Sequence, residues 1–127
     1  MKKISIISAA FVLFILGYVA IADQYKFEIY DAAIEFEAGL SELSAKSVDI
    51  SIGTISYYEN QQPSSKPSVL LVHGFGAYKE NWLRFARAFK DDFHVVVIDL
   101  PGHGSSVQTM DLTYNLSNQL AWVNEFT

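Results

Sequence analysis

The sequence contains no cysteine in its 127 residues, which excludes disulfides, thiol nucleophiles and thiolate metal ligands. Histidine is scarce too, and His73, His94 and His103 show neither the H-x-H nor the H-E-x-x-H spacing of a metal site. We therefore expect no bound metal. Nothing in the sequence calls for an organic cofactor, and we expect none.

Basic residues are few: nine Lys and Arg stand against 14 Asp and Glu, giving a net charge of −5. Without a basic patch, we expect no nucleic-acid partner. The acidic excess falls within residues 23–49. The length allows one domain at most.

An uncharged, largely apolar run, Ile4–Ala22, follows Lys2 and Lys3. As a helix with a rise of about 1.5 Å per residue, it would extend roughly 28 Å, close to a bilayer's hydrocarbon thickness of about 30 Å. Two interpretations stay open, a signal peptide cleaved after Ala22 and an uncleaved membrane anchor. Both place the rest of the chain outside the cytoplasm, either anchored and facing the periplasm or exterior, or secreted.

Apolar residues at helical spacing predict an acidic, amphipathic helix over Asp23–Ser44: Ile29, Ala33, Phe36, Leu40 and Leu43. We expect its apolar side to pack on the domain. The other interpretation is an interfacial helix that guides lipid substrates to a site. The predicted organisation is therefore a signal or anchor (1–22), an amphipathic helix (23–46) and a domain (47–127).

The remaining sequence predicts an α/β fold. Two unalternating apolar runs, Val69–Val72 and Val95–Ile98, are typical of parallel strands covered on both faces. Between them, Tyr78–Lys90 predicts a crossover helix with an apolar stripe of Trp82, Phe85, Ala86 and Phe89.

Shorter elements flank this βαβ unit. Residues 47–52 and 54–58 predict a β-hairpin that turns at Gly53, and residues 60–67 predict a surface loop. Residues 107–113 are polar and irregular. Leu116, Leu120 and Val123 mark a following helix, for which Asn115 is the predicted N-cap.

Glycine-rich loops follow both parallel strands, at the sheet edge where ligands bind in open α/β sheets. They read His73-Gly74-Phe75-Gly76 and Asp99-Leu100-Pro101-Gly102-His103-Gly104. This pair resembles the α/β-hydrolase fold family. With the Lys-x-x-Trp series Lys79–Trp82, it is most similar to membrane-bound monoacylglycerol lipases and lipases of cold-adapted bacteria. The resemblance covers roughly residues 36–126.

The resemblance implies that the Phe75 backbone N–H is one oxyanion-hole donor in ester hydrolysis. Gly74 and Gly76 would let the backbone approach a substrate, a lipid or small ester, without a Cβ in the way. The competing interpretation is that the glycines only form a tight turn and Phe75 fills a core position.

The other loop residues are expected to be structural. The family's chain order places the catalytic acid and histidine after the nucleophile, which argues against proton transfer by His73, Asp99 or His103. We expect both imidazoles to brace their turns and the Asp99 carboxylate to cap loop N–H groups. Pro101, Gly102 and Gly104 belong to the same compact turn, and His94 to a strand edge.

No Gly-x-Ser-x-Gly nucleophile motif occurs in the sequence; Ser105 and Ser106 do not form one. We therefore expect an incomplete α/β-hydrolase fold, the N-terminal portion of a serine lipase or esterase that is inactive and poorly soluble alone. Two alternatives stay open: a non-catalytic membrane-bound interaction module, and a hydrolase with an aspartate nucleophile, such as a dehalogenase or epoxide hydrolase.

Overall fold

The computed structural model describes residues 2–61 and 66–127 and, among their side chains, 8–61 and 66–127. The predicted loop over residues 60–67 therefore lies partly outside the described residues, as do the side chains of Lys2 and Lys3. The chain divides into two compact units, Met1–Glu35 and Phe36–Thr127. The three-part organisation predicted from the sequence stays a prediction.

The first unit is helical. Helix α1 spans Lys2–Gln24, and α2 (Lys26–Leu40) begins after a break at Tyr25, where the two helices are bent by 63°. Apolar side chains of α1 are exposed, among them Phe11 and Leu13. Over the described residues, no single helix is long and apolar enough to span a bilayer; the bent pair meets these criteria only together.

Helix α2 ends earlier than predicted, and the face that it buries differs from the predicted one. Glu42 has a left-handed backbone (φ 56°), which stops the helix before Leu43, the first residue of strand β1. Phe36 and Leu40 stay 66% and 42% exposed, so the prediction that this apolar stripe packs on the domain is wrong for them. Ala38 is buried instead.

Polar contacts fasten the end of α2 to the domain. Ser41 is fully buried, and its hydroxyl donates to the Leu83 carbonyl (2.6 Å) and lies 3.0 Å from the Glu37 carbonyl oxygen, with which it shares the same hydrogen. Glu37 also receives hydrogen bonds from Arg84 (3.1 Å) and Arg87 (2.7 Å).

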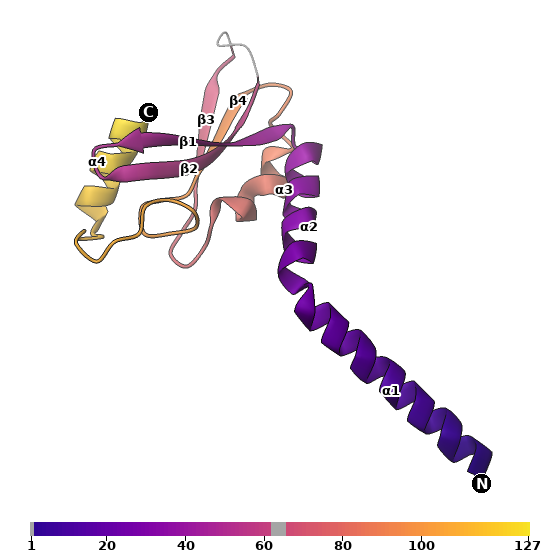
Figure 1. Cartoon of the computed structure of the whole chain (residues 1–127). Coiled ribbons are helices and arrows are strands. Elements are labelled where there is room, and N and C mark those ends of the chain that lie inside the picture. The colour runs from indigo at the N-terminus through magenta and orange to yellow at the C-terminus, as the bar shows by residue number, and fades with distance from the viewer. Residues whose placement is uncertain (1, 62–65) are drawn as a thin grey trace. The chain divides into compact units, whose positions relative to one another are not determined.

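In the described part of the chain, four strands form one mixed sheet in the order β1-β2-β4-β3 (Figure 1). Strands β1 (Leu43–Ile50) and β2 (Gly53–Asn60) make the predicted antiparallel hairpin, with a turn at residues 51–52. Strands β3 (Ser68–Val72) and β4 (His94–Ile98) are parallel, as predicted.

Burial differs between the parallel strands. Val95, Val97 and Ile98 of β4 are buried, whereas β3 is an edge strand among the described residues and has only half-buried or exposed side chains. Within the described residues, β3 is therefore not covered on both faces.

The crossover is less regular than predicted. A 3₁₀ turn, η1 (Lys79–Trp82), leads into one turn of helix, α3 (Leu83–Ala86), and residues 87–93 form turns. A 3₁₀ turn has three residues per turn, so the side chains that follow are rotated away from a continuous α-helical stripe. Ala86 of the predicted stripe is buried, but Leu83, which is outside the stripe, is buried with it, while Phe85 is 49% exposed.

Helix α4 (Leu116–Phe126) follows an irregular segment and confirms the predicted cap, since Asn115 Oδ1 accepts the Asn118 N–H at 2.8 Å. Figure 1 shows α4 beside the β1–β2 hairpin. There, Glu125 accepts hydrogen bonds from the Ser51 N–H and hydroxyl, both at 2.6 Å. Within α4, Trp122 is buried, whereas Leu116 and Leu120 are exposed.

Candidate active site

The two glycine-rich loops meet at one edge of the sheet. Val72, the last residue of β3, pairs with Ile98, the last residue of β4, so the loops that follow start side by side. The rings of His73 and His103 lie 5.0 Å apart, and those of Phe75 and His103 lie 6.3 Å apart. The structure thus brings the sequence-predicted site residues together.

His73 is buried, and both of its ring nitrogens are used within this edge. The Leu100 N–H donates to Nε2 (3.0 Å), so Nε2 is the unprotonated nitrogen. Nδ1 then carries the hydrogen and donates to the Gly74 carbonyl (2.9 Å). His73 therefore links the first loop to the second and has no free nitrogen for abstracting a proton, which supports a structural role.

Asp99 is buried at the end of β4 and receives three hydrogen bonds. The Lys79 backbone N–H donates to Oδ1 (2.8 Å), and the Ser105 N–H (3.0 Å) and Lys79 ammonium (2.6 Å) donate to Oδ2. This carboxylate thus caps N–H groups as expected, and it also ties η1 to the second loop.

Lys79 is the partner of Asp99, and the sequence did not predict this role. Its side chain is only 4% exposed and lies over the Tyr58 ring, with Nζ 3.0 Å from Glu80 Oε1. Burial lowers the pKa of Lys79, but hydrogen bonds and charge pairing with Asp99 and Glu80 outweigh it, so the pKa is raised. Lys79 is therefore a buried cation paired with two carboxylates. The Lys-x-x-Trp series contained it, but nothing in that series signalled burial.

The second loop closes tightly around the Asp99 carboxylate. Gly104 has φ 52°, and a Cβ at this position would lie 2.1 Å from Asp99 Oδ2. Only glycine fits there. Ser106, also missed, is buried; its hydroxyl donates to the Asp99 carbonyl (2.7 Å) and accepts the Ser56 N–H (2.9 Å), which fastens the loop to β2.

The rest of the second loop supports this turn. Pro101 is buried, and Gly102 donates its N–H to the Val107 carbonyl (2.8 Å). His103 braces the turn weakly, with Nδ1 3.4 Å from the Pro101 carbonyl oxygen.

The first loop presents Phe75 to solvent. The Phe75 side chain is fully exposed (101%), which is against its filling a core position. Gly76 has φ 71°, and the turn is closed by the Ala77 N–H on the Gly74 carbonyl (3.2 Å). Within the described part of the chain, the Phe75 N–H makes no hydrogen bond and is free for an external acceptor.

A cavity of about 180 Å³ lies behind this loop, lined by His73, Gly74, Ala77, Asn81 and Trp82. A larger cavity of about 310 Å³ is elsewhere, at the start of β3 and β4, and His94 belongs to that one. Within the described residues, no group of three or more His, Asp or Glu side chains is placed to hold a metal ion.

Residues 67–127 match a family described as alpha/beta hydrolase fold. Monoacylglycerol lipase abhd6-B of Xenopus laevis is 37% identical over 71 residues, which are 55% of this chain and 21% of that protein. Lipase 3 of Moraxella sp. (strain TA144) is 29% identical over 120 residues, 94% of this chain and 38% of the relative. The chain thus spans well under half the length of these relatives.

Solved structures of hydrolases are also similar to this chain. A membrane phospholipase A has a TM-score of 0.72 and 35% identity, over 99% of this chain and 39% of that protein. A haloalkane dehalogenase from Bradyrhizobium elkanii, DbeA, has a TM-score of 0.61 and 24% identity over 66% of this chain and 28% of that protein; it supports the fold alone.

Proposed function

Residues 67–127 belong to the α/β-hydrolase fold family, and on that premise we propose that the chain is the N-terminal part of a serine hydrolase that cleaves carboxylic esters of lipids. The observation that carries the proposal is the free Phe75 N–H, held at the sheet edge beside the second loop. Such a donor stabilises the negative charge that develops on the ester carbonyl oxygen in the transition state.

Phe75 would supply one of two oxyanion donors. In this fold the second donor is the backbone N–H of the residue after the nucleophile, which sits on a Gly-x-Ser-x-Gly turn. We propose that this turn lies in polypeptide beyond Thr127 in the intact protein. Gly74 supports the assignment. A Cβ at this position would enter open space, so crowding within the loop does not explain why the residue is glycine. Closeness to a substrate is a reason that fits both Gly74 and Gly76.

The surrounding residues would hold this donor in place. His73 joins the first loop to Leu100, and Asp99 joins η1 to Ser105, so the two loops form one hydrogen-bonded unit. Preorganised donors need no rearrangement when charge develops, which is the source of their catalytic value.

Lipid substrates are proposed from the relatives and from α1. The relatives carry the names monoacylglycerol lipase, lipase and membrane phospholipase A. Exposed apolar side chains cover the described part of α1, which suits a membrane anchor or the apolar core of a signal peptide. We propose export in both cases, with the α/β unit facing the periplasm or exterior.

The test uses the intact protein that contains these 127 residues, supplied with a monoacylglycerol and, separately, a short-chain ester. Hydrolysis that is blocked by a fluorophosphonate, with the probe attached to one serine on a Gly-x-Ser-x-Gly turn, is the expected result. Turnover of a haloalkane or an epoxide, without hydrolysis of either ester and without serine labelling, would favour an aspartate nucleophile. Neither hydrolysis nor labelling would contradict the proposal and favour a non-catalytic module.

A further inference from the structure

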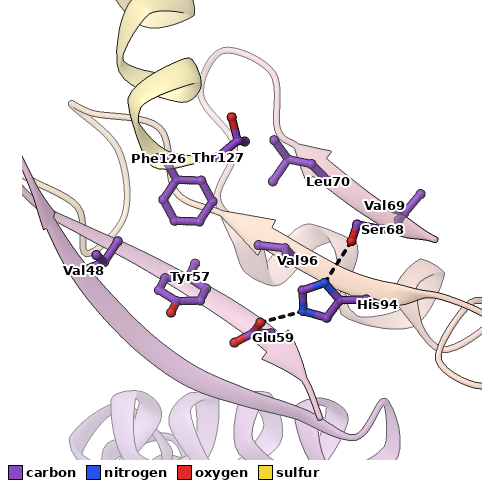
Figure 2. A pocket seen from close by; sticks show the side chains of 10 residues that line it. All are labelled: Val48, Tyr57, Glu59, Ser68, Val69, Leu70, His94, Val96, Phe126 and Thr127. Atoms are coloured by element: carbon purple, nitrogen blue, oxygen red, sulfur yellow. Dashed lines mark hydrogen bonds and ion pairs between the residues drawn. The ribbon is translucent and has the colours of Figure 1, made fainter. Parts of the chain in front are cut away.

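A second cluster of chemically capable side chains lies at the other end of the parallel strands, at the start of β3 and β4. Figure 2 shows Ser68, His94 and Glu59 joined in a line across three neighbouring strands. Ser68 Oγ lies 3.1 Å from His94 Nδ1, and His94 Nε2 lies 2.5 Å from Glu59 Oε1. A hydroxyl, an imidazole and a carboxylate in this order form the arrangement that activates a serine nucleophile.

Strand pairing sets this arrangement. Ser68 of β3 is directly opposite His94 of β4 in the parallel register, while Glu59 of β2 pairs with Val96, two residues along from His94. Directly opposite and diagonal neighbours on one face of a sheet are within side-chain reach. The three side chains therefore meet because of the sheet itself.

The hydrogen bond to Glu59 selects the tautomer of neutral His94. A carboxylate only accepts, so His94 Nε2 carries the hydrogen donated to Glu59. Neutral His94 Nδ1 is then an acceptor and takes the hydrogen bond from the Ser68 hydroxyl.

Lys46 supports the ionised state of Glu59. Its ammonium lies 2.5 Å from Glu59 Oε2. This hydrogen bond lowers the pKa of Glu59 more than partial burial raises it, and His94 lowers it further. At neutral pH, Glu59 is therefore a carboxylate that can orient the imidazole and stabilise its protonated form.

An apolar cavity adjoins the exposed hydroxyl of Ser68. It has a volume of about 310 Å³ and, beside the three polar residues, is lined by Val48, Tyr57, Val69, Leu70, Val96, Phe126 and Thr127 (Figure 2). The volume is at the lower end of the range for small-molecule pockets, roughly 300–1,000 Å³. A short acyl chain suits both its size and its walls.

We propose that Ser68 is an acyl-accepting nucleophile, with His94 as its general base, Glu59 as the residue that positions His94, and the apolar cavity as the acyl site. Ser68 Oγ attacks the carbonyl carbon of an activated ester while its proton passes to His94 Nδ1. The new Oγ–C bond forms, the bond to the leaving phenolate breaks, and His94 later releases the proton to water. We assign no oxyanion donor here, so the expected reaction is a single acylation.

The test uses the full 127-residue chain in detergent micelles with p-nitrophenyl butyrate, and does not depend on the proposed function. We expect one butyryl group per chain, located on Ser68 by peptide mass spectrometry and absent in Ser68→Ala. The matched control is Ser47→Ala, an exposed strand serine that is not in the cluster, and it should be acylated like the wild type.

The mechanism is tested by His94→Gln, which places a side-chain amide where the imidazole was; an amide can form hydrogen bonds but cannot act as a base. Loss of a general base should slow acylation about a hundredfold or more. Glu59→Gln should slow it less and lower the rate at saturating ester rather than the affinity. Circular dichroism of each variant confirms folding. Absence of labelling at Ser68, or equal rates for wild type and His94→Gln, would overturn the proposal and reduce the cluster to a structural contact between strands.

Discussion

Replacing Lys79 by methionine tests the buried ion pair that joins the two loops. The Lys79 and Asp99 side chains are 4% and 0% exposed, so the variant leaves the Asp99 carboxylate buried without its cation. Removing one partner of a buried pair costs about 3–5 kcal/mol. Asp99 keeps two backbone N–H donors, from position 79 and Ser105, and we therefore expect a loss near the lower value, about 3 kcal/mol.

Urea unfolding of the 127-residue chain in micelles, followed by tryptophan fluorescence, measures this loss. Lys26→Met is the matched control, because Lys26 is exposed and its ion pair is with exposed Asp23; the free energy of unfolding should not change measurably. The double variant Lys79→Met/Asp99→Asn should lose less unfolding free energy than the two single variants lose together, since it removes the unpaired charge.

The same pair predicts a dependence on alkaline pH. The folded pKa of Lys79 is raised above its ordinary value of 10.5, so the stabilisation is fully present below pH 10.5 and is lost as pH rises through the folded pKa. The stability difference between wild type and Lys79→Met should therefore shrink above pH 10.5. A loss below 1 kcal/mol for Lys79→Met at neutral pH, or a difference that grows at alkaline pH, would refute this reasoning.

Three further predictions concern single residues. Gly104→Ala should destabilise the chain by about 3 kcal/mol or more in urea unfolding, because its Cβ would overlap the Asp99 carboxylate; unchanged stability would contradict the geometry. Asn60→Ala should cost about 3 kcal/mol, since its buried amide holds the Val95 N–H and two carbonyl groups, and protection of the Val95 amide from hydrogen exchange should fall. Glu59 has a lowered pKa, so its contribution is present above pH 4.5 and disappears as pH falls through the folded value; Glu59→Gln should flatten the acid side of the stability profile, and an unaltered profile would contradict this.

The sequence predicted the parts whose signals are local. The apolar runs around Val69–Val72 and Val95–Ile98 each end at polar and glycine residues, and both are strands, with their loops at one sheet edge. Asn115 was predictable as the helix cap because an asparagine side chain just before the first helical turn can accept an unpaired backbone N–H, here that of Asn118.

The predictions that were wrong concern features that are set by tertiary contacts, and a single sequence does not reveal those contacts. Glu42 takes a left-handed conformation although neither glycine nor proline marks the place, so the end of α2 was missed. The 3₁₀ turn at Lys79–Trp82 is fastened by the distant Asp99 carboxylate, and this turn moved Phe85 out of the predicted stripe. Nothing local marks Lys79 and Ser106 as buried, because their partners are on other elements.

Removing the Phe75 N–H while keeping the loop tests the central claim most directly. In the intact protein, Phe75→Pro deletes the donor, whereas Phe75→Leu keeps it and changes only an exposed side chain. Loss of one oxyanion donor lowers kcat by about 10²–10³. We predict a loss of this size for Phe75→Pro, with kcat for Phe75→Leu near that of the wild type and both variants equally stable; equal kcat for proline and leucine would contradict the assignment.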